Sequence, residues 1–318
     1  MKKLFSAILA VIMLLSVTAC SVKDDGKYVV GICQLMKHDA LDAATQGFMD
    51  AIIAELGEEN VEFDLQIAAG DSNICSNIVL DFVNSEVDLI MANATPALLA
   101  AFAATEDIPI LGTSITTYGA AMGIELVDGV VGGNVSGTSD LAPLDQQAAM
   151  IKEWCPDAKT VGLLYCSAEP NSKYQVDTVQ KELELLGFTC KQYAFSSTSD
   201  MAAVTQTAAD NSDVIYVPTD NTVAESTGIV DGICRPAGIP VIAGEKGICA
   251  GCGIATLSID YYDLGIATGK MAVKILTGKA DISTMKIEYA PEFSKLYNAE
   301  ICDDLNITNI PDGYSPIQ

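Results

Sequence analysis

The sequence predicts an α/β protein with two Rossmann-like lobes, each built on a parallel sheet. From residue 28 onward, short apolar runs rich in β-branched residues alternate with amphipathic stretches of helical length. That alternation is typical of βαβ units. A glycine-rich interval at residues 114–139 interrupts it, and the same alternation then resumes. With 318 residues, the chain is long enough for two lobes of ordinary domain size.

In the first half, strands are expected at residues 28–35, 61–69, 87–93 and 108–113, with helices at 39–56, 74–84 and 96–105 between them. The first of these helices shows the expected period most clearly. Its apolar residues recur at helical spacing, namely Leu41, Ala44, Phe48, Ile52 and Leu56.

In the second half, strands are expected at residues 160–166, 189–195, 214–219, 239–244 and 253–259. Helices are expected at residues 145–155, 174–187, 201–210 and 222–234. Residues 261–278 then predict one long amphipathic helix. The tail from residue 282 is expected to form short strands and turns.

The first twenty residues have the pattern of an export signal. Lys2 and Lys3 precede an apolar run from residue 4 to residue 15, and small residues then lead to Cys20. A dozen apolar residues are too few to span a hydrocarbon core of about 30 Å comfortably. We therefore expect a lipoprotein signal peptide at residues 1–19, lipidation of Cys20 and a tether at residues 20–26. The alternative is an ordinary secretory signal with Cys20 incidental.

Charge and cysteine content limit the partners. The formal charge is −25, with Arg235 as the single arginine, and such a chain repels nucleic acid. The nine cysteines after Cys20 are odd in number and scattered, unlike a disulfide framework. Cys249 and Cys252 form the one close pair, which leaves a metal half-site, a redox pair or a local disulfide open. A structural zinc site needs about four ligands, and the one histidine, His38, is distant in sequence, so no metal or cofactor is expected.

Polar residues follow the carboxyl ends of the predicted strands, where open parallel sheets bind ligands. These candidates are Gln34, His38, Asn93, Thr95, Thr113, Ser114, Thr116, Asn171, Asp220, Asn221, Glu245 and Asp260. The hydroxyls of Thr95, Thr113 and Ser114 suit a carboxylate, and a carboxylate side chain suits an ammonium group. Alternatively, such residues merely cap helices. Motifs of hydrolases, metalloproteases and P-loop enzymes are absent from the sequence, so an enzyme is not expected.

Several long stretches resemble the extracytoplasmic substrate-binding lipoproteins of bacterial ABC importers, in the branch related to tryptophan- and tyrosine-binding components. These stretches include HDALDAATQGFMDAI, VDLIMANATPALLAAFAATEDIPILGTSIT, VIYVPTDNTVAES and SIDYYDLGIATGKMAVKIL. The resemblance implies a type I periplasmic-binding fold whose chain crosses between lobes three times. The first lobe would comprise residues 27–138 and 260–286, and the second residues 139–259 and 287–318.

The same resemblance implies a function and adds two residues, Ser139 and Asp140, to the expected ligand site. The protein would capture a small molecule between its lobes, with an aromatic or other apolar amino acid as the favoured class, and deliver it to an ABC permease. It would act as a monomer anchored outside the cell membrane, on a Gram-positive surface or in a periplasm. Residues 245–255 depart from the family pattern through their two cysteines. Binding of a nucleoside, sugar or peptide fragment, or a sensory role, stays open.

Overall fold

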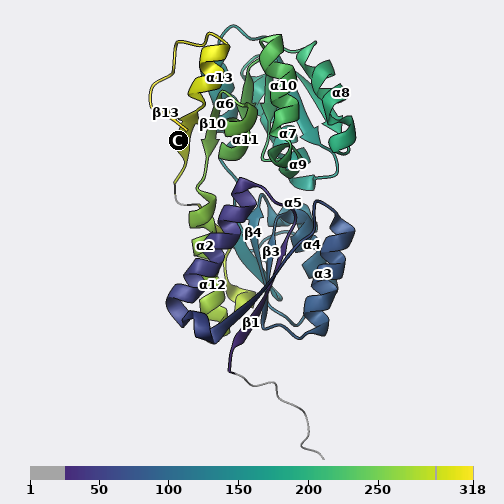
Figure 1. The fold of residues 1–318 in the computed structure, drawn as a ribbon, viewed down its shortest axis with the longest axis vertical. Coiled ribbons are helices and arrows are strands. Elements are labelled where there is room, and N and C mark those ends of the chain that lie inside the picture. The colour runs from purple at the N-terminus through teal and green to yellow at the C-terminus, as the bar shows by residue number, and fades with distance from the viewer. Residues whose placement is uncertain (1–25, 291, 318) are drawn as a thin grey trace, which may run out of the picture.

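The computed structural model describes residues 26–290 and 292–317. Two α/β lobes are stacked end to end (Figure 1). These lobes confirm the predicted fold class. The expected signal peptide, the lipidation site Cys20 and nearly all of the tether lie outside the described residues. Within the described residues, no helix is both long enough and apolar enough to cross a membrane.

The first lobe is a six-stranded sheet in the order β11-β5-β4-β3-β1-β2, with every neighbouring pair parallel. Its strands are β1 (Tyr28–Gln34), β2 (Val61–Ile67), β3 (Leu89–Asn93), β4 (Ile110–Ile115), β5 (Val135–Ser139) and β11 (Glu288–Tyr289). Its helices are α2 (Asp39–Leu56), α3 (Ser72–Asn84), α4 (Thr95–Ala104), α5 (Tyr118–Met122) and α12 (Tyr261–Leu276), with 3₁₀ turns at Glu58–Asn60 and Ile282–Thr284.

Both faces of this sheet are covered, as a parallel sheet requires. Side chains alternate along β1: Val30 and Ile32 pack in the core beneath α2 and α12, whereas Cys33 packs in the core beneath α3 and α4. The strand is therefore apolar on both sides and reads as a continuous buried run.

Helices α2 and α12 lie side by side against one face (Figure 1). Glycines make their close approach possible. A Cβ on Gly265 would lie 2.1 Å from the carbonyl oxygen of Ala44, and one on Gly47 would lie 2.1 Å from that of Tyr262. The two helices thus pack backbone to backbone, and this fixes the start of α12 beside the start of α2.

The second lobe is a seven-stranded sheet in the order β13-β12-β10-β9-β8-β6-β7, parallel except for the antiparallel pair β10 and β12. Its strands are β6 (Thr160–Cys166), β7 (Thr189–Phe195), β8 (Val214–Val217), β9 (Val241–Ala243), β10 (Ala255–Ser258), β12 (Ser294–Tyr297) and β13 (Ser315–Pro316). Its helices are α6 (Leu144–Trp154), α7 (Pro170–Leu185), α8 (Thr198–Ala209), α9 (Asn221–Glu225), α10 (Thr227–Ala237), α11 (Lys246–Cys252) and α13 (Ala299–Asp304).

The chain passes between the lobes after β5, after β10 and after β11. The last passage comes later than the boundary expected at residue 286. Glu288 and Tyr289 still pair with β5 in the first sheet. Two residues add an edge strand there, which a sequence pattern cannot distinguish from a connecting loop.

Several elements differ from the sequence-based expectation, including α5, which lies inside the glycine-rich interval. Residues 222–234 form two helices, α9 and α10, with a break at Ser226 instead of one helix. Helix α11 was not expected, because its sequence KGICAGC contains two glycines, which are poor helix formers. Strand β5 lies inside the glycine-rich interval, and α13 lies in the tail that was expected to hold only strands and turns.

Candidate ligand-binding site

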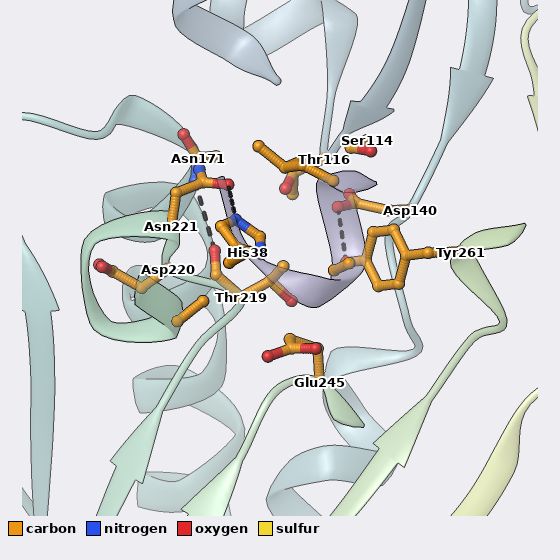
Figure 2. A pocket seen from close by; sticks show the side chains of 13 residues that line it. His38, Ser114, Thr116, Asp140, Asn171, Thr219, Asp220, Asn221, Glu245 and Tyr261 are labelled. Carbon is orange, nitrogen blue, oxygen red and sulfur yellow. Dashed lines mark hydrogen bonds between the residues drawn. The ribbon is translucent and has the colours of Figure 1, made fainter. Parts of the chain in front are cut away.

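A small cavity lies where the two lobes meet (Figure 2). Both lobes and the connecting segments contribute to its wall. The lining residues are His38, Ala40, Leu41, Ser114, Thr116, Asp140, Asn171, Thr219, Asp220, Asn221, Ala224, Glu245 and Tyr261. Eight of them are candidates from the sequence: His38, Ser114, Thr116, Asp140, Asn171, Asp220, Asn221 and Glu245.

Each polar lining residue follows the carboxyl end of a strand or belongs to a connecting segment. His38 precedes α2, and Ser114 and Thr116 lie at the end of β4. In the second lobe, Asn171 opens α7, and Asp220 caps α9 after β8. The sheets therefore direct their strand ends toward one another, as the rule for open parallel sheets predicts.

Ser114 is held in an unusual backbone conformation. Its φ angle is +56°, in the left-handed region that a side chain other than glycine seldom adopts. The pairing of β4 with β5 shifts register between Gly112 and Ile115, and the hydroxyl of Tyr118 bonds to the Gly112 carbonyl at 3.0 Å. This irregularity turns the buried Ser114 into the cavity wall. Strained residues of this kind concentrate at functional sites.

Three buried polar atoms in the cavity wall have no hydrogen-bond partner among the described residues. They are Ser114 Oγ, Asp140 Oδ1 and Asn171 Oδ1. A buried polar group without a partner costs about 1–3 kcal/mol, so native proteins leave few of them. Because these three atoms line one cavity from the two lobes and the hinge, a bound polar ligand would satisfy them together.

Asp140 lies in the first connection between the lobes. Its Oδ2 accepts a hydrogen bond of 3.0 Å from the hydroxyl of Tyr261, which begins α12 after the second connection (Figure 2). Burial raises the pKa of Asp140 to about 6, against the lowering effect of the hydrogen bond from Tyr261. A cation placed at the open Oδ1 would stabilise the ionised carboxylate.

Asp220 and Glu245 cap helices as well as lining the cavity. Asp220 accepts from Val223 N at 3.0 Å and from Cys166 N at 2.7 Å. Burial and the neighbouring Glu169 carboxylate raise the pKa of Asp220 to about 8. Glu245 accepts from the backbone amides that open α11, and burial raises its pKa. Their carboxylate oxygens are therefore already engaged by backbone amides.

Six candidate residues do not line the cavity. Gln34, Asn93 and Thr113 stand side by side in the register at the ends of β1, β3 and β4. All three side chains form hydrogen bonds with residues of the neighbouring helices α2 and α12 and do not reach the cavity. Thr45 donates to Gln34 Oε1 at 2.6 Å, Asn93 donates to Thr45 Oγ1 at 3.0 Å, and Thr268 donates to Thr113 Oγ1 at 3.1 Å.

The other three lie just outside the wall. Ser139 donates to the carbonyl of Thr116 at 2.9 Å, and Asp260 caps α12 through Asp263 N. Thr95 is buried at the first position of α4. Asp260 therefore acts as a helix cap, as the alternative interpretation of the strand-end residues proposed, whereas its neighbour Tyr261 lines the cavity.

Three side chains at or beside the cavity were not among the candidates: Thr219, Tyr261 and Gln175. Thr219 and Tyr261 adjoin candidates Asp220 and Asp260, so the correct loops were identified but not the correct side chain. Gln175 lies one helical turn after Asn171, and its Nε2 is 3.4 Å from Thr116 Oγ1 in the other lobe. Because Asn171 and Gln175 are four residues apart on α7, they share one face of the helix, and this spacing could have identified Gln175 from the sequence.

The cysteine pair lies in the core behind the site. All nine cysteines in the described part of the chain are free thiols. Cys249 and Cys252 both belong to α11, and burial raises the pKa of each thiol. A raised pKa makes a cysteine unreactive. No group of three or more histidine, cysteine or acidic residues within residues 26–290 and 292–317 could hold a metal ion.

Two α/β lobes with a polar cavity at their junction define a periplasmic-binding-type protein. The family model described as ABC transporter substrate binding protein matches residues 29–312. The chain belongs to this family and is a substrate-binding component of an ABC transporter. Such components act outside the cytoplasmic membrane, bind a small molecule and work with a membrane permease.

Relatives and solved structures extend the comparison. A tyrosine-binding protein of Clostridioides difficile is 34% identical over 295 residues, covering 88% of this chain and 85% of the relative. A structure described as the ABC domain in complex with L-Trp from Streptococcus pneumoniae has a TM-score of 0.86 at 31% identity, covering 92% of this chain and all of that one. The ligand-free, open structure of a substrate-binding protein with adhesive properties from Clostridium difficile has a TM-score of 0.70 at 36% identity, covering 92% and 99%.

Proposed function

We propose that the protein captures an aromatic amino acid in the cavity between its lobes and delivers it to an ABC importer. The observation that carries this proposal is the convergence of Ser114 Oγ, Asp140 Oδ1 and Asn171 Oδ1, three buried atoms without a partner, in one cavity wall. Two similar proteins are named for tyrosine or were solved with L-Trp, which supports the same ligand class.

The ligand is oriented by charge. Its ammonium group donates to Asp140 Oδ1 and Asn171 Oδ1, because a buried cation needs anionic or carbonyl partners. Its carboxylate accepts from the hydroxyls of Ser114 and Thr116. Its side chain packs among Leu41, the ring of Tyr261 and the imidazole of His38, where aromatic rings stack well.

Ligand capture closes the lobes. Two contacts join them here: Asn221 Oδ1 lies 3.1 Å from His38 Nε2, and Gln175 bonds to Thr116. The greater similarity to the L-Trp complex than to the open protein, despite higher identity to the latter, supports a closed arrangement. The ligand shifts an open–closed equilibrium by binding the closed form better.

The proposal includes a lipid anchor that holds the protein at the membrane. Removal of residues 1–19 exposes Cys20 for lipidation, and a short tether keeps a monomeric binding protein close to its permease. Mass spectrometry of the mature amino terminus would detect the lipid. An unmodified amino terminus at another residue would contradict the lipid anchor and indicate an ordinary secreted protein.

The proposed ligand class is tested by calorimetry on protein that has been unfolded, stripped of ligand and refolded. We expect tyrosine, tryptophan or phenylalanine to bind more tightly than the other amino acids. Heat from none of the twenty would contradict the proposal. Mass spectrometry of the solute that copurifies with native protein then identifies a nucleoside, sugar or peptide if one of these is the ligand.

A further inference from the structure

Glu169 is a buried carboxylate on which five donors converge. Its Oε2 accepts from Asn171 Nδ2 at 3.1 Å, from Asn221 N at 3.0 Å and from Asn221 Nδ2 at 2.7 Å. Its Oε1 accepts from Thr222 N at 2.9 Å and from Thr222 Oγ1 at 2.7 Å. An ionised carboxylate can only accept hydrogen bonds, so all five groups must present their hydrogens to it.

This arrangement fixes the orientation of both asparagine amides. Each amide has one donor end and one acceptor end, and in both residues the donor end, Nδ2, faces Glu169. The acceptor ends therefore face away. Asn171 Oδ1 is left without a partner in the cavity wall, and Asn221 Oδ1 meets His38 Nε2 across the lobes (Figure 2). Asn171 Nδ2 also lies 3.3 Å from the carbonyl of Thr219, which favours the same orientation.

The orientation of Asn221 also determines the proton on His38. Because Asn221 Oδ1 can only accept, His38 Nε2 must carry a hydrogen. Neutral His38 is thus the Nε2–H tautomer in the closed form, with Nδ1 unprotonated. His38 is the single histidine of the sequence, so its ring can be observed without interference from another.

We propose that Glu169 is a positioning residue that makes the second-lobe wall of the cavity a hydrogen-bond acceptor. It thereby selects ligands with a cationic amino group and orients the bond that holds the lobes closed. Glu169 acts through Asn171 and Asn221 and does not line the cavity itself. This inference rests on the proposed function, because it assumes that an amino acid occupies the site.

The test compares Glu169→Gln with the wild-type protein. A glutamine amide has a single acceptor oxygen, so it cannot accept from all five groups. Where its NH₂ faces the asparagines, an asparagine must rotate its own NH₂ toward the cavity. The probes are L-tyrosine and L-tryptophan, each paired with the α-hydroxy acid in which a hydroxyl replaces the amino group. The wild-type protein should prefer the amino acid strongly, and Glu169→Gln should reduce that preference on the order of 10-fold or more.

A second readout follows the ring of His38 by ¹⁵N NMR in the ligand complex, in alkaline buffer where imidazole is neutral. The wild-type protein should show the Nε2–H tautomer alone, and Glu169→Gln should show a mixture. Glu184→Gln is the matched control, since Glu184 is an exposed glutamate on α7, the helix that begins directly after Glu169, and it should change neither readout. If Glu169→Gln fails to fold, Asn171→Ala should reduce the same ligand preference, because it removes the acceptor directly.

The outcomes separate the two proposals. If the wild-type protein binds none of tyrosine, tryptophan and phenylalanine, the proposed function is wrong and this inference fails with it. If the wild-type protein binds one of them and Glu169→Gln keeps both the ligand preference and the single tautomer, only the role of Glu169 is overturned.

Discussion

At the scale of single residues, Asp140 carries most of the chemistry of the cavity. One of its oxygens is engaged by Tyr261, and the other is buried without a partner. Burial raises its pKa to about 6, because the charged form of the carboxylate is poorly stabilised away from water. The ligand ammonium would neutralise the buried negative charge of Asp140. Ligand affinity should therefore depend more on the charge of this side chain than on its shape.

Asp140→Asn tests the charge directly. Asparagine keeps an acceptor for Tyr261 but removes the anion, and a hydrogen bond to a charged group contributes about 1.5–3 kcal/mol. Calorimetry should therefore show amino-acid binding weakened by roughly 10- to 100-fold. The exposed Asp107→Asn serves as control and should bind like the wild-type protein. Equal affinities of Asp140→Asn and the wild-type protein would contradict the claim that the Asp140 carboxylate binds the ammonium group of the ligand.

Sequence reasoning found the loops of the site more reliably than its side chains. Strand-end position identified Ser114, Asn171 and Asn221, since parallel strands bring their carboxyl ends to one edge. The same rule included Gln34 and Asn93, which form hydrogen bonds with Thr45 on α2 instead of lining the cavity. Which of two neighbouring residues turns inward depends on local backbone geometry, such as the left-handed φ of Ser114, and the pattern does not encode it.

At the scale of elements, the packing of α2 on α12 holds the site together. His38 precedes α2 and Tyr261 begins α12, so the spacing of these helices sets the distance between the two rings. That spacing depends on glycines whose Cβ atoms would collide with the facing backbone. The helices were predictable from their apolar period, but this close approach was visible only in three dimensions.

Gly265→Ala should destabilise the protein. Its Cβ would lie 2.1 Å from the carbonyl oxygen of Ala44, so the helices must separate, at a cost of about 1–3 kcal/mol or more. Gly232→Ala in α10 is the matched control, because a Cβ there has no atom within 4 Å. That substitution should stabilise the protein by about 0.4–1 kcal/mol. Urea unfolding curves measure both, and a stable Gly265→Ala protein would contradict the close packing.

At the scale of the whole molecule, buried carboxylates oppose closure of an empty cavity. Burial raises the pKa values of Asp140 and Glu245 in the closed form, whereas water entering an open cleft would lower them toward ordinary values. A group that is easier to protonate in the closed form favours that form as the pH falls. At neutral pH, the ammonium group of the ligand would favour the closed form in the same way, because it neutralises the buried negative charge.

Ligand-free protein should therefore close partly as the pH falls through about 6. Small-angle X-ray scattering should show a smaller radius of gyration in mildly acidic than in neutral buffer. In Asp140→Asn the radius should depend less on pH, because the neutral side chain has no charge to lose. A wild-type radius that does not change with pH, or an equal change in Asp140→Asn, would contradict this role for Asp140.

The central claim, that the cavity binds an amino acid through Asp140, is tested most directly by a crystal structure of the protein with tyrosine or tryptophan. We expect the ligand between the lobes, with its ammonium nitrogen about 2.7–3.2 Å from Asp140 Oδ1 and its carboxylate at Ser114. A ligand bound outside this cavity, or one that turns its carboxylate toward Asp140, would contradict the account.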